Sequence, residues 1–231
     1  MATQTTKIII CFANSRKPPS GRCIAGKELT PAGVGPWIRP ISARPTHELS
    51  EEERWYQNGQ DPRVLDVIEV PIVGPRPHAY QVENFLIDDQ FYWSSTARAT
   101  KSQVMACLDS VTGPLWGVGS STYGTNDRID EHAAGSLGSS LKLVEVKDLK
   151  VTVGIEGAEF GNARRKVRGE FTLHGIPYRL SITDPTVERE YYQKSNGSYP
   201  VGHAILCLSL GEAHRGYAYK LVAGLILPTQ I

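Results

Sequence analysis

The sequence predicts a mainly β chain with few short helices, in a barrel or sandwich architecture. Two observations carry this prediction. Short runs of apolar or alternating residues, bounded by Gly, Pro, Asn, Asp and Ser, recur over most of the 231 residues. Helix signals, in contrast, are confined to a few short segments. The length allows one large all-β domain or two small ones, each with a core of its own.

The first half opens on a buried strand. Residues 7–13 form an apolar run that ends in a polar, basic loop from Asn14 to Cys23, which contains Pro and Gly. A rigid strand that ends in such a loop presents positive charge to a ligand. Further strands are predicted at 23–29, 35–41 and 64–71, and the last of these alternates as a half-buried strand does.

Two short helices are predicted from capping boxes. Ser50 precedes Glu53, and Thr100 precedes Gln103, at the spacing that lets each side chain bond to the other's backbone N–H. The first helix should end near 58–59, at Asn-Gly, and the second around 112–114, at Thr-Gly-Pro.

Residues 117–140 are rich in Gly, Ser, Thr and Asn and predict a long loop, a kind of segment that often carries function. We expect the domain boundary here, with domains at 1–135 and 136–231. Strands then resume, with a hairpin turn at 174–175 (His-Gly) and a helix at 187–193 that begins at Asp184-Pro185. The predicted strands are 141–146, 150–155, 165–173, 176–182, 204–210 and 218–227.

Composition excludes several classes of function. Lys and Arg (25) nearly cancel Asp and Glu (24), so no global field attracts long DNA, RNA or an anionic membrane. No stretch approaches the roughly 20 apolar residues of a membrane span, and no signal-peptide pattern occurs, which predicts a cytoplasmic protein. The four cysteines and six histidines lack zinc-site spacing, and P-loop and G-x-S-x-G motifs are absent. We therefore expect no metal and no cofactor.

The first-half loop and the strand around Trp37 hold the first candidate site. A guanidinium donates two parallel hydrogen bonds to phosphate, and an indole stacks on a base. The alternative is that Trp37 belongs to the core and the charges form a solvated rim. The candidate residues are Asn14, Arg16, Lys17, Arg22, Trp37 and Arg39.

A second candidate site lies in the long loop. Asn126, Asp127 and Arg128 offer an amide, a carboxylate and a guanidinium in consecutive positions, and Tyr123 is a further stacking candidate. The competing interpretation is an Asx turn with an Asp–Arg pair. Lys220, in a strand with apolar alternate residues, is either a ligand contact inside a cleft or an edge charge.

The order of short motifs in this chain resembles the bacterial dual OB-containing domain proteins, over nearly the whole length. The motifs are Ala13-Asn-Ser-Arg-Lys17, Gly21-Arg-Cys-Ile-Ala-Gly26, Trp37-Ile-Arg-Pro-Ile-Ser42, Leu49-Ser-Glu-Glu-Glu-Arg54, Asp66-Val-Ile-Glu-Val-Pro71, Asn126-Asp-Arg128, Leu137-Gly-Ser-Ser140, Ser181-Ile-Thr-Asp-Pro185, Leu208-Ser-Leu-Gly-Glu212 and Tyr217-Ala-Tyr-Lys-Leu-Val222. The resemblance implies two OB-like Greek-key barrels in tandem, a fold that binds oligonucleotides on one face with the help of loops.

The sequence therefore favours a non-catalytic protein that binds a single-stranded nucleic acid or a nucleotide-like anion. In that interpretation phosphate is neutralised by Arg16, Lys17, Arg22 and Arg39. Asn126 and Arg128 bond to sugar or base, and Trp37 or Tyr123 stacks on a base. One alternative is an enzyme in which Asp127 is a general base and Arg128 stabilises charge. Another is a module that docks a protein partner in a larger bacterial system, such as a defence system.

Overall fold

The computed structural model describes residues 5–231, which divide into two compact units. The N-terminal unit comprises the chain up to Leu108 together with 138–140 and Ile231. The C-terminal unit comprises 109–137 and 141–230. Residues 109–135, which were expected in the first domain, therefore pack with the C-terminal unit. The domain boundary between residues 135 and 136 stays a prediction.

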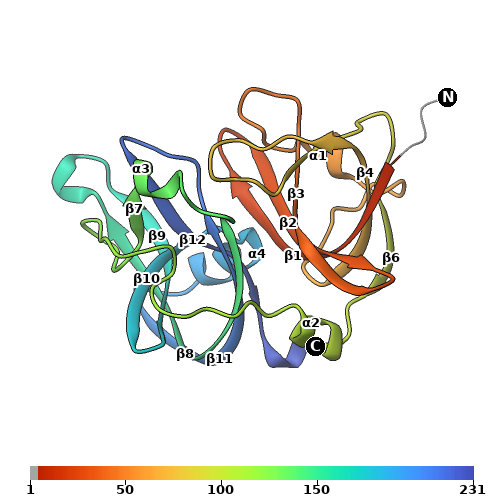
Figure 1. Ribbon diagram of the computed structural model, residues 1–231. Helices are drawn as coiled ribbons and strands as arrows, with labels where there is room; N and C mark the ends of the chain where they lie inside the picture. Colours follow the sequence, from red (N-terminus) through yellow and green to blue (C-terminus); the bar gives the residue numbers. More distant parts are fainter. Residues whose placement is uncertain (1–4) are drawn as a thin grey trace. The chain divides into compact units, whose positions relative to one another are not determined.

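The N-terminal unit is a five-stranded barrel with a sixth strand added. Its strands pair in the order β1-β2-β3-β5-β4, and pairing of β4 with β1 closes the ring; β6 pairs with β4 (Figure 1). Only β3 and β5 run parallel; the other pairs are antiparallel. The elements are β1 (Thr5–Lys17), β2 (Gly21–Thr30), β3 (Gly33–Ile41), α1 (Glu51–Arg54), β4 (Asp66–Pro75), β5 (Asn84–Ile87), β6 (Ser94–Arg98) and α2 (Lys101–Ala106).

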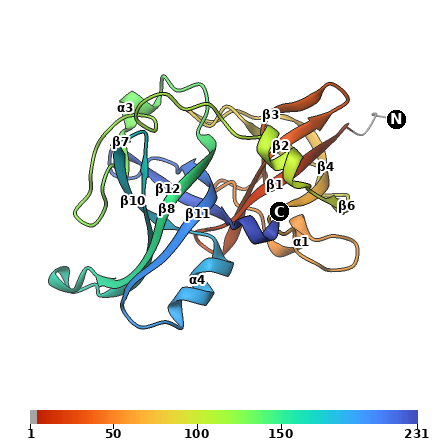
Figure 2. The same cartoon turned by 90° about the horizontal axis from the view of Figure 1, so that it is seen from below.

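The C-terminal unit repeats this connectivity. Its ring is β8-β9-β10-β12-β11, closed by pairing of β11 with β8, again with one parallel pair, β10–β12 (Figure 2). Strand β7 adds to β12. Both units thus have the Greek-key order of an OB barrel, and the predicted fold class is confirmed. The elements are β7 (Arg128–Asp130), α3 (Glu131–Ala134), β8 (Leu141–Glu156), η1 (Ala158–Phe160), β9 (Arg164–Leu173), β10 (Ile176–Ile182), α4 (Pro185–Tyr192), β11 (Gly197–Leu210), β12 (Tyr217–Ile226) and η2 (Pro228–Gln230).

Each barrel encloses its own apolar core, built from alternate residues of its strands. In the N-terminal unit Ile9, Ile24, Ile38 and Ile68 are fully buried in one cluster. In the C-terminal unit Val151, Leu180, Leu206 and Val222 do the same. The intervening residues of β1 are buried as well, since Ile10 and Phe12 are both 0% exposed.

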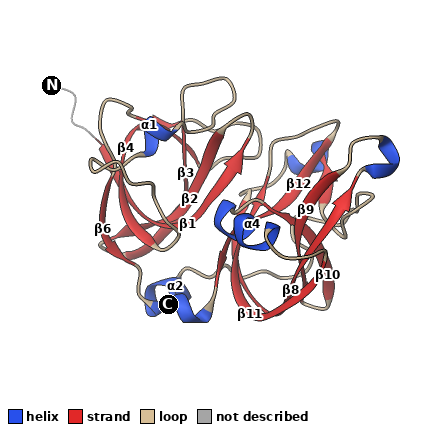
Figure 3. Cartoon of the chain, turned by 180° about the vertical axis from the view of Figure 1, so that it is seen from behind, coloured by secondary structure: helices blue, strands red, loops and turns tan. Residues whose placement is uncertain are grey.

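The helices are few and short, as expected (Figure 3). Both predicted capping boxes are present, at Ser50–Glu53 and Thr100–Gln103. Helix α1 ends at Arg54, earlier than predicted, because Trp55 is already extended. The predicted hairpin turn at His174 and Gly175 has φ of 50° and 77°, as a primed turn requires. Within residues 5–231 no helix is long and apolar enough to cross a bilayer.

Several elements differ from the sequence prediction. Residues 141–156 form one continuous strand rather than two. Strand β11 begins at Gly197, earlier than predicted, and pairs with β8 on both sides of a register irregularity near Gly202. Strands β5 and β6 were not predicted; β5 is only four residues long, too short to show a periodicity, and every residue of β6 is exposed. The loop at 117–140 contains β7 and α3.

Candidate functional site

The end of the β1–β2 hairpin gathers the basic residues that the sequence singled out. Arg16 and Arg22 are direct cross-strand partners, and Lys17 is the last residue of β1. Arg22 shares its face with Ile24, which belongs to the barrel core. The two guanidinium groups therefore lie over one end of the barrel. Like charges directly opposite each other destabilise an antiparallel pair, so this arrangement needs a compensating role.

Arg22 is half-buried, and within residues 5–231 its guanidinium makes no hydrogen bond or ion pair. Its Nε is buried without a partner. Burial lowers the pKa of Arg22, and the nearby charges of Arg54 and Arg16 lower it further, against the opposing effect of Asp61. A cation in this position is electrostatically unsatisfied and is a favourable contact for an anion.

The segment after β3 borders the hairpin end and holds it in place. Arg22 and Leu49 exchange two backbone hydrogen bonds of 2.9 Å. A Cβ on Gly21 would lie 2.2 Å from Cγ of Glu48, so glycine is required for this close packing. Asn14, a predicted ligand residue, donates from Nδ2 to the carbonyl of Pro62 at 2.7 Å. This hydrogen bond ties β1 to the segment that precedes β4.

Two predicted ligand residues have other roles in the structure. Arg39 is 2% exposed, lies 3.2 Å from Glu83, and donates to Asn84 at 3.3 Å and to Ser140 at 2.9 Å. Its side chain is committed to this buried network and is not available to phosphate. Trp37 is 8% exposed and packs edge-on against Phe12, with ring centroids 6.0 Å apart. It therefore belongs to the core, the alternative that the sequence left open.

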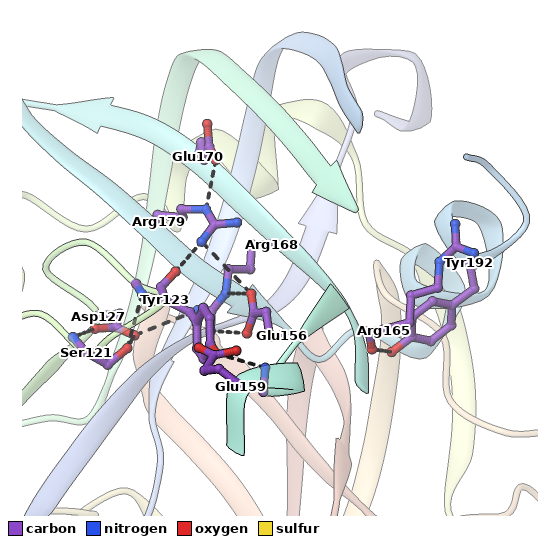
Figure 4. Close-up of polar contacts among 12 residues, drawn as sticks. Ser121, Tyr123, Asp127, Glu156, Glu159, Arg165, Arg168, Glu170, Arg179 and Tyr192 are labelled. Atoms are coloured by element: carbon purple, nitrogen blue, oxygen red, sulfur yellow. Dashed lines mark hydrogen bonds and ion pairs between the residues drawn. The ribbon is translucent and has the colours of Figure 1, made fainter. Parts of the chain in front are cut away.

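The predicted loop site lies in the C-terminal unit, where Asp127 is buried at 3% exposure. Its Oδ1 accepts from the backbone N–H of Ser121 at 2.7 Å and its Oδ2 from the Ser121 hydroxyl at 2.6 Å, while Arg168 lies 3.7 Å away (Figure 4). A Cβ on Gly124 would lie only 1.8 Å from Oδ2, so the loop can close on Asp127 only with glycine there. Asn126 has φ of 47° and donates to the carbonyl of Pro177 at 2.9 Å.

Around Asp127 an ion-pair network links the loop to the strands. Arg168 binds Glu156 through two hydrogen bonds of 2.6 and 2.8 Å, and Arg179 donates to Glu170 at 2.9 Å (Figure 4). Arg179 also donates to the carbonyl of Tyr123. The loop and the β10 edge further share hydrogen bonds between Thr125 and Arg179. Acidic and basic groups are balanced here, so the network holds the loop and leaves no unsatisfied cation among those named.

The remaining loop-site residues are also engaged. The hydroxyl of Tyr123 donates to Glu159 and accepts from the backbone N–H of Gly157. The guanidinium of Arg128 lies 3.9 Å from the centre of the Tyr217 ring. Lys220 is 1% exposed, and its Nζ donates to the carbonyl of Gly117 at 2.7 Å. Burial lowers the pKa of Lys220 to about 8, against the opposing charge of Asp127.

A family model for the dual OB-containing domain matches residues 7–225. The chain belongs to this family. In this dual OB-containing domain protein the match runs through both barrels, from β1 to β12. Comparisons with curated proteins and with solved structures gave no match.

The dual OB-containing domain protein also carries a pocket that the sequence analysis missed, in its N-terminal unit. It has a volume of about 600 Å³ and lies where the turn after α1 meets the segment that leads into β6. A turn of Asn, Gly and Gln and an aromatic run, Phe91-Tyr92-Trp93, were the available signals. The lining residues are Tyr56, Gln57, Asn58, Gln60, Asp61, Arg63, Asp66, Tyr92, Trp93, Ser94 and Ser95.

Two histidines of the N-terminal unit, His47 and His78, lie close together. Their rings lie edge to face with centroids 5.0 Å apart. Two imidazoles supply two of the four ligands of a structural zinc, so the pair does not by itself define a metal site.

Proposed function

We propose that the protein is a non-catalytic binding protein for a single-stranded nucleic acid or a nucleotide-like anion, held at the hairpin end of the N-terminal unit. The proposal rests on one observation: the half-buried guanidinium of Arg22 makes no hydrogen bond or ion pair within residues 5–231. Arg16 lies directly opposite it and Lys17 ends the same strand. A phosphate bound here would accept hydrogen bonds from Arg22 and balance the positive charge of the three side chains.

The connection between the first two strands is one of the regions by which OB barrels bind oligonucleotides, and here the three cations lie on the strand residues on either side of it. The overall charge of +1 argues against long duplexes, because affinity for them grows with the number of phosphates neutralised. A short single strand or a free nucleotide suits a local cluster of three cations. Such ligands are abundant in the cytoplasm, where we place the protein.

The buried position of Asp127 favours binding over catalysis. A general base must reach the proton that it abstracts, but both carboxylate oxygens of Asp127 already accept hydrogen bonds from Ser121. The proposal therefore assigns the loop from Tyr123 to Arg128 a structural role, and it assigns ligand contact to Arg16, Lys17 and Arg22.

Fluorescence anisotropy tests this proposal, with short labelled single-stranded RNA, single-stranded DNA and duplex DNA at two salt concentrations. The test variant carries Arg16→Ala, Lys17→Ala and Arg22→Ala. The control carries Lys101→Ala and Arg189→Ala, which remove exposed charges from helices α2 and α4. We expect salt-sensitive binding to a single strand that the test variant loses and the control keeps. Equal binding by both variants, or no binding of any probe, would reject a polynucleotide ligand at this site.

A further inference from the structure

The pocket of the N-terminal unit is lined mostly by polar side chains, and its two carboxylates already accept hydrogen bonds. Asp61 accepts from Nε and Nη2 of Arg54, at 2.5 and 3.1 Å. Asp66 accepts from the Tyr56 hydroxyl and from the backbone N–H of Arg63, both at 2.9 Å. Asp61 is ion-paired with Arg54, and Asp66 lies 3.5 Å from Arg98, so each carboxylate has a cation beside it. These cations reduce the negative charge that a ligand carrying phosphate would meet.

The pocket also offers groups that are not engaged. Within residues 5–231 the side-chain amides of Gln57 and Gln60 have no hydrogen-bond partner, and both residues are exposed. Each amide presents one acceptor and two donors. Tyr92 is 63% exposed at the wall. A flat exposed ring beside unpaired amides suits a planar heterocycle, which stacks on the ring and pairs its edge with amides.

The pocket lies near the hairpin end, because the charge of Asp61, which lines the pocket, acts on Arg22. Asp61 lines the pocket and is bound by Arg54, whose charge also acts on Arg22. Arg54 in addition donates to the carbonyl of Leu49, the residue that pairs with the Arg22 backbone. One ligand can therefore place a phosphate on the hairpin end and a neighbouring group in the pocket.

We infer that this pocket receives a nucleobase of the ligand whose phosphate lies on Arg22, with Tyr92 as the stacking surface and Gln57 and Gln60 reading the base edge. The inference rests on the proposed function. It assigns base contact to the connection between β3 and β4 and to the segment before β6, outside the strand face and loops through which OB barrels bind oligonucleotides.

The test compares anisotropy binding of Tyr92→Ala, Tyr92→Phe and Phe91→Ala with that of the unchanged protein. Phe91 is the matched control because it is an adjacent exposed aromatic, 46% exposed, that does not line the pocket. The probes are a labelled single strand of about 12 nucleotides, within the site size of OB folds, and an abasic strand of the same length. Unlabelled nucleoside monophosphates serve as competitors and show whether a free nucleotide fills the same site.

We expect Tyr92→Ala to weaken binding of the base-bearing strand by about 5- to 150-fold, the value of one stacked base, and to leave the abasic strand unchanged. Tyr92→Phe and Phe91→Ala should bind both strands as the unchanged protein does. If Tyr92→Ala binds both strands normally while the hairpin variant loses them, the pocket inference is wrong and the proposed function stands. If the hairpin variant binds normally, both are wrong. If no strand binds, the pocket inference and a polynucleotide ligand are both rejected.

Discussion

Arg22 shows how a single residue can lower stability in the service of binding. Its guanidinium is half-buried, faces Arg16 across the hairpin and makes no hydrogen bond or ion pair within residues 5–231. Burial of an unpaired cation costs free energy that folding must offset from elsewhere. Binding residues often carry such a cost, because the same group that is unsatisfied in the free protein is satisfied by the ligand.

We therefore expect Arg22→Met to raise the free energy of unfolding, by about 0.5–2 kcal/mol, since it keeps the apolar stem and removes the unpaired charge. Urea denaturation at neutral pH and low salt measures this value. Arg189→Met, at an exposed position of α4, is the control and should change stability by less than about 0.5 kcal/mol. A loss of stability in Arg22→Met would mean that this side chain makes a stabilising contact and would remove the argument for a vacant anion site.

Lys220 predicts a pH dependence of stability. Burial lowers its pKa to about 8 in the folded protein, against about 10.4 in an unfolded chain. Between these values the unfolded state binds more protons than the folded state, so stability rises as pH increases from about 8 towards 9.5. Asp127 and the Tyr178 ring, 5.6 Å from Nζ, are the groups that face it.

Urea denaturation across this pH range should show that Lys220→Met lacks the rise seen in the unchanged protein. Lys147→Met, at an exposed position of β8, should keep it. If the unchanged protein and Lys220→Met follow the same pH profile, the lysine does not titrate in this range and its lowered pKa is contradicted.

At the scale of single residues, the sequence predicted which side chains carry charge near the hairpin end better than it predicted which of them are buried. It singled out the basic residues of the hairpin end but expected a loop from Asn14 to Cys23, whereas β1 runs to Lys17 and β2 begins at Gly21. It misplaced Arg39, whose partners Glu83 and Ser140 are distant in the chain and become neighbours only in the folded barrel. The pocket was missed for the same reason, since its two walls, at 56–66 and 92–95, are at least 26 residues apart in the chain.

Among the elements, α4 illustrates a helix whose start is encoded locally and whose position depends on the barrel. Asp184 accepts from the backbone N–H of Thr186 at 2.9 Å and of Val187 at 3.4 Å, and Pro185 occupies the first turn. Its second oxygen accepts from the N–H of Leu225 in β12 at 3.4 Å. Burial raises the pKa of this carboxyl.

We expect Asp184→Ala to lower the free energy of unfolding by about 1–3 kcal/mol, because it removes the cap and leaves the buried N–H of Leu225 without an acceptor. Asp184→Asn keeps an acceptor oxygen and removes a buried charge, so it should retain or increase stability. Thermal unfolding of the three proteins decides this. Equal losses in both variants would show that the negative charge, and not the hydrogen bonding, stabilises the helix.

Elements with local signals were predicted well, and elements defined by pairing were not. The capping boxes at Ser50 and Thr100 and the turn at His174 are short-range patterns, and all three are present. Strand β5 has four residues and is fixed by its neighbours β3 and β4, so no periodicity announces it. Hydrophobicity alone could not show that residues 141–156 form one continuous strand rather than two.

At the scale of the whole molecule, two barrels of the same connectivity differ in how their charges are arranged. The C-terminal unit pairs Arg168 and Arg179 with Glu156 and Glu170. The N-terminal unit leaves Arg22 unpaired within the described residues and places it opposite Arg16. A net charge of +1 therefore hides a local concentration of positive charge. This asymmetry is why we assign ligand binding to the first barrel.

The most direct test of this account is the salt dependence of single-strand binding by the unchanged protein and by Arg22→Met. For single strands, the slope of log affinity against log salt is about −0.7 for each phosphate neutralised. The account predicts weaker binding by Arg22→Met, with a slope shallower by about 0.7, because one phosphate contact is lost. The same affinity and the same slope in both proteins would show that Arg22 touches no phosphate and would contradict the central claim.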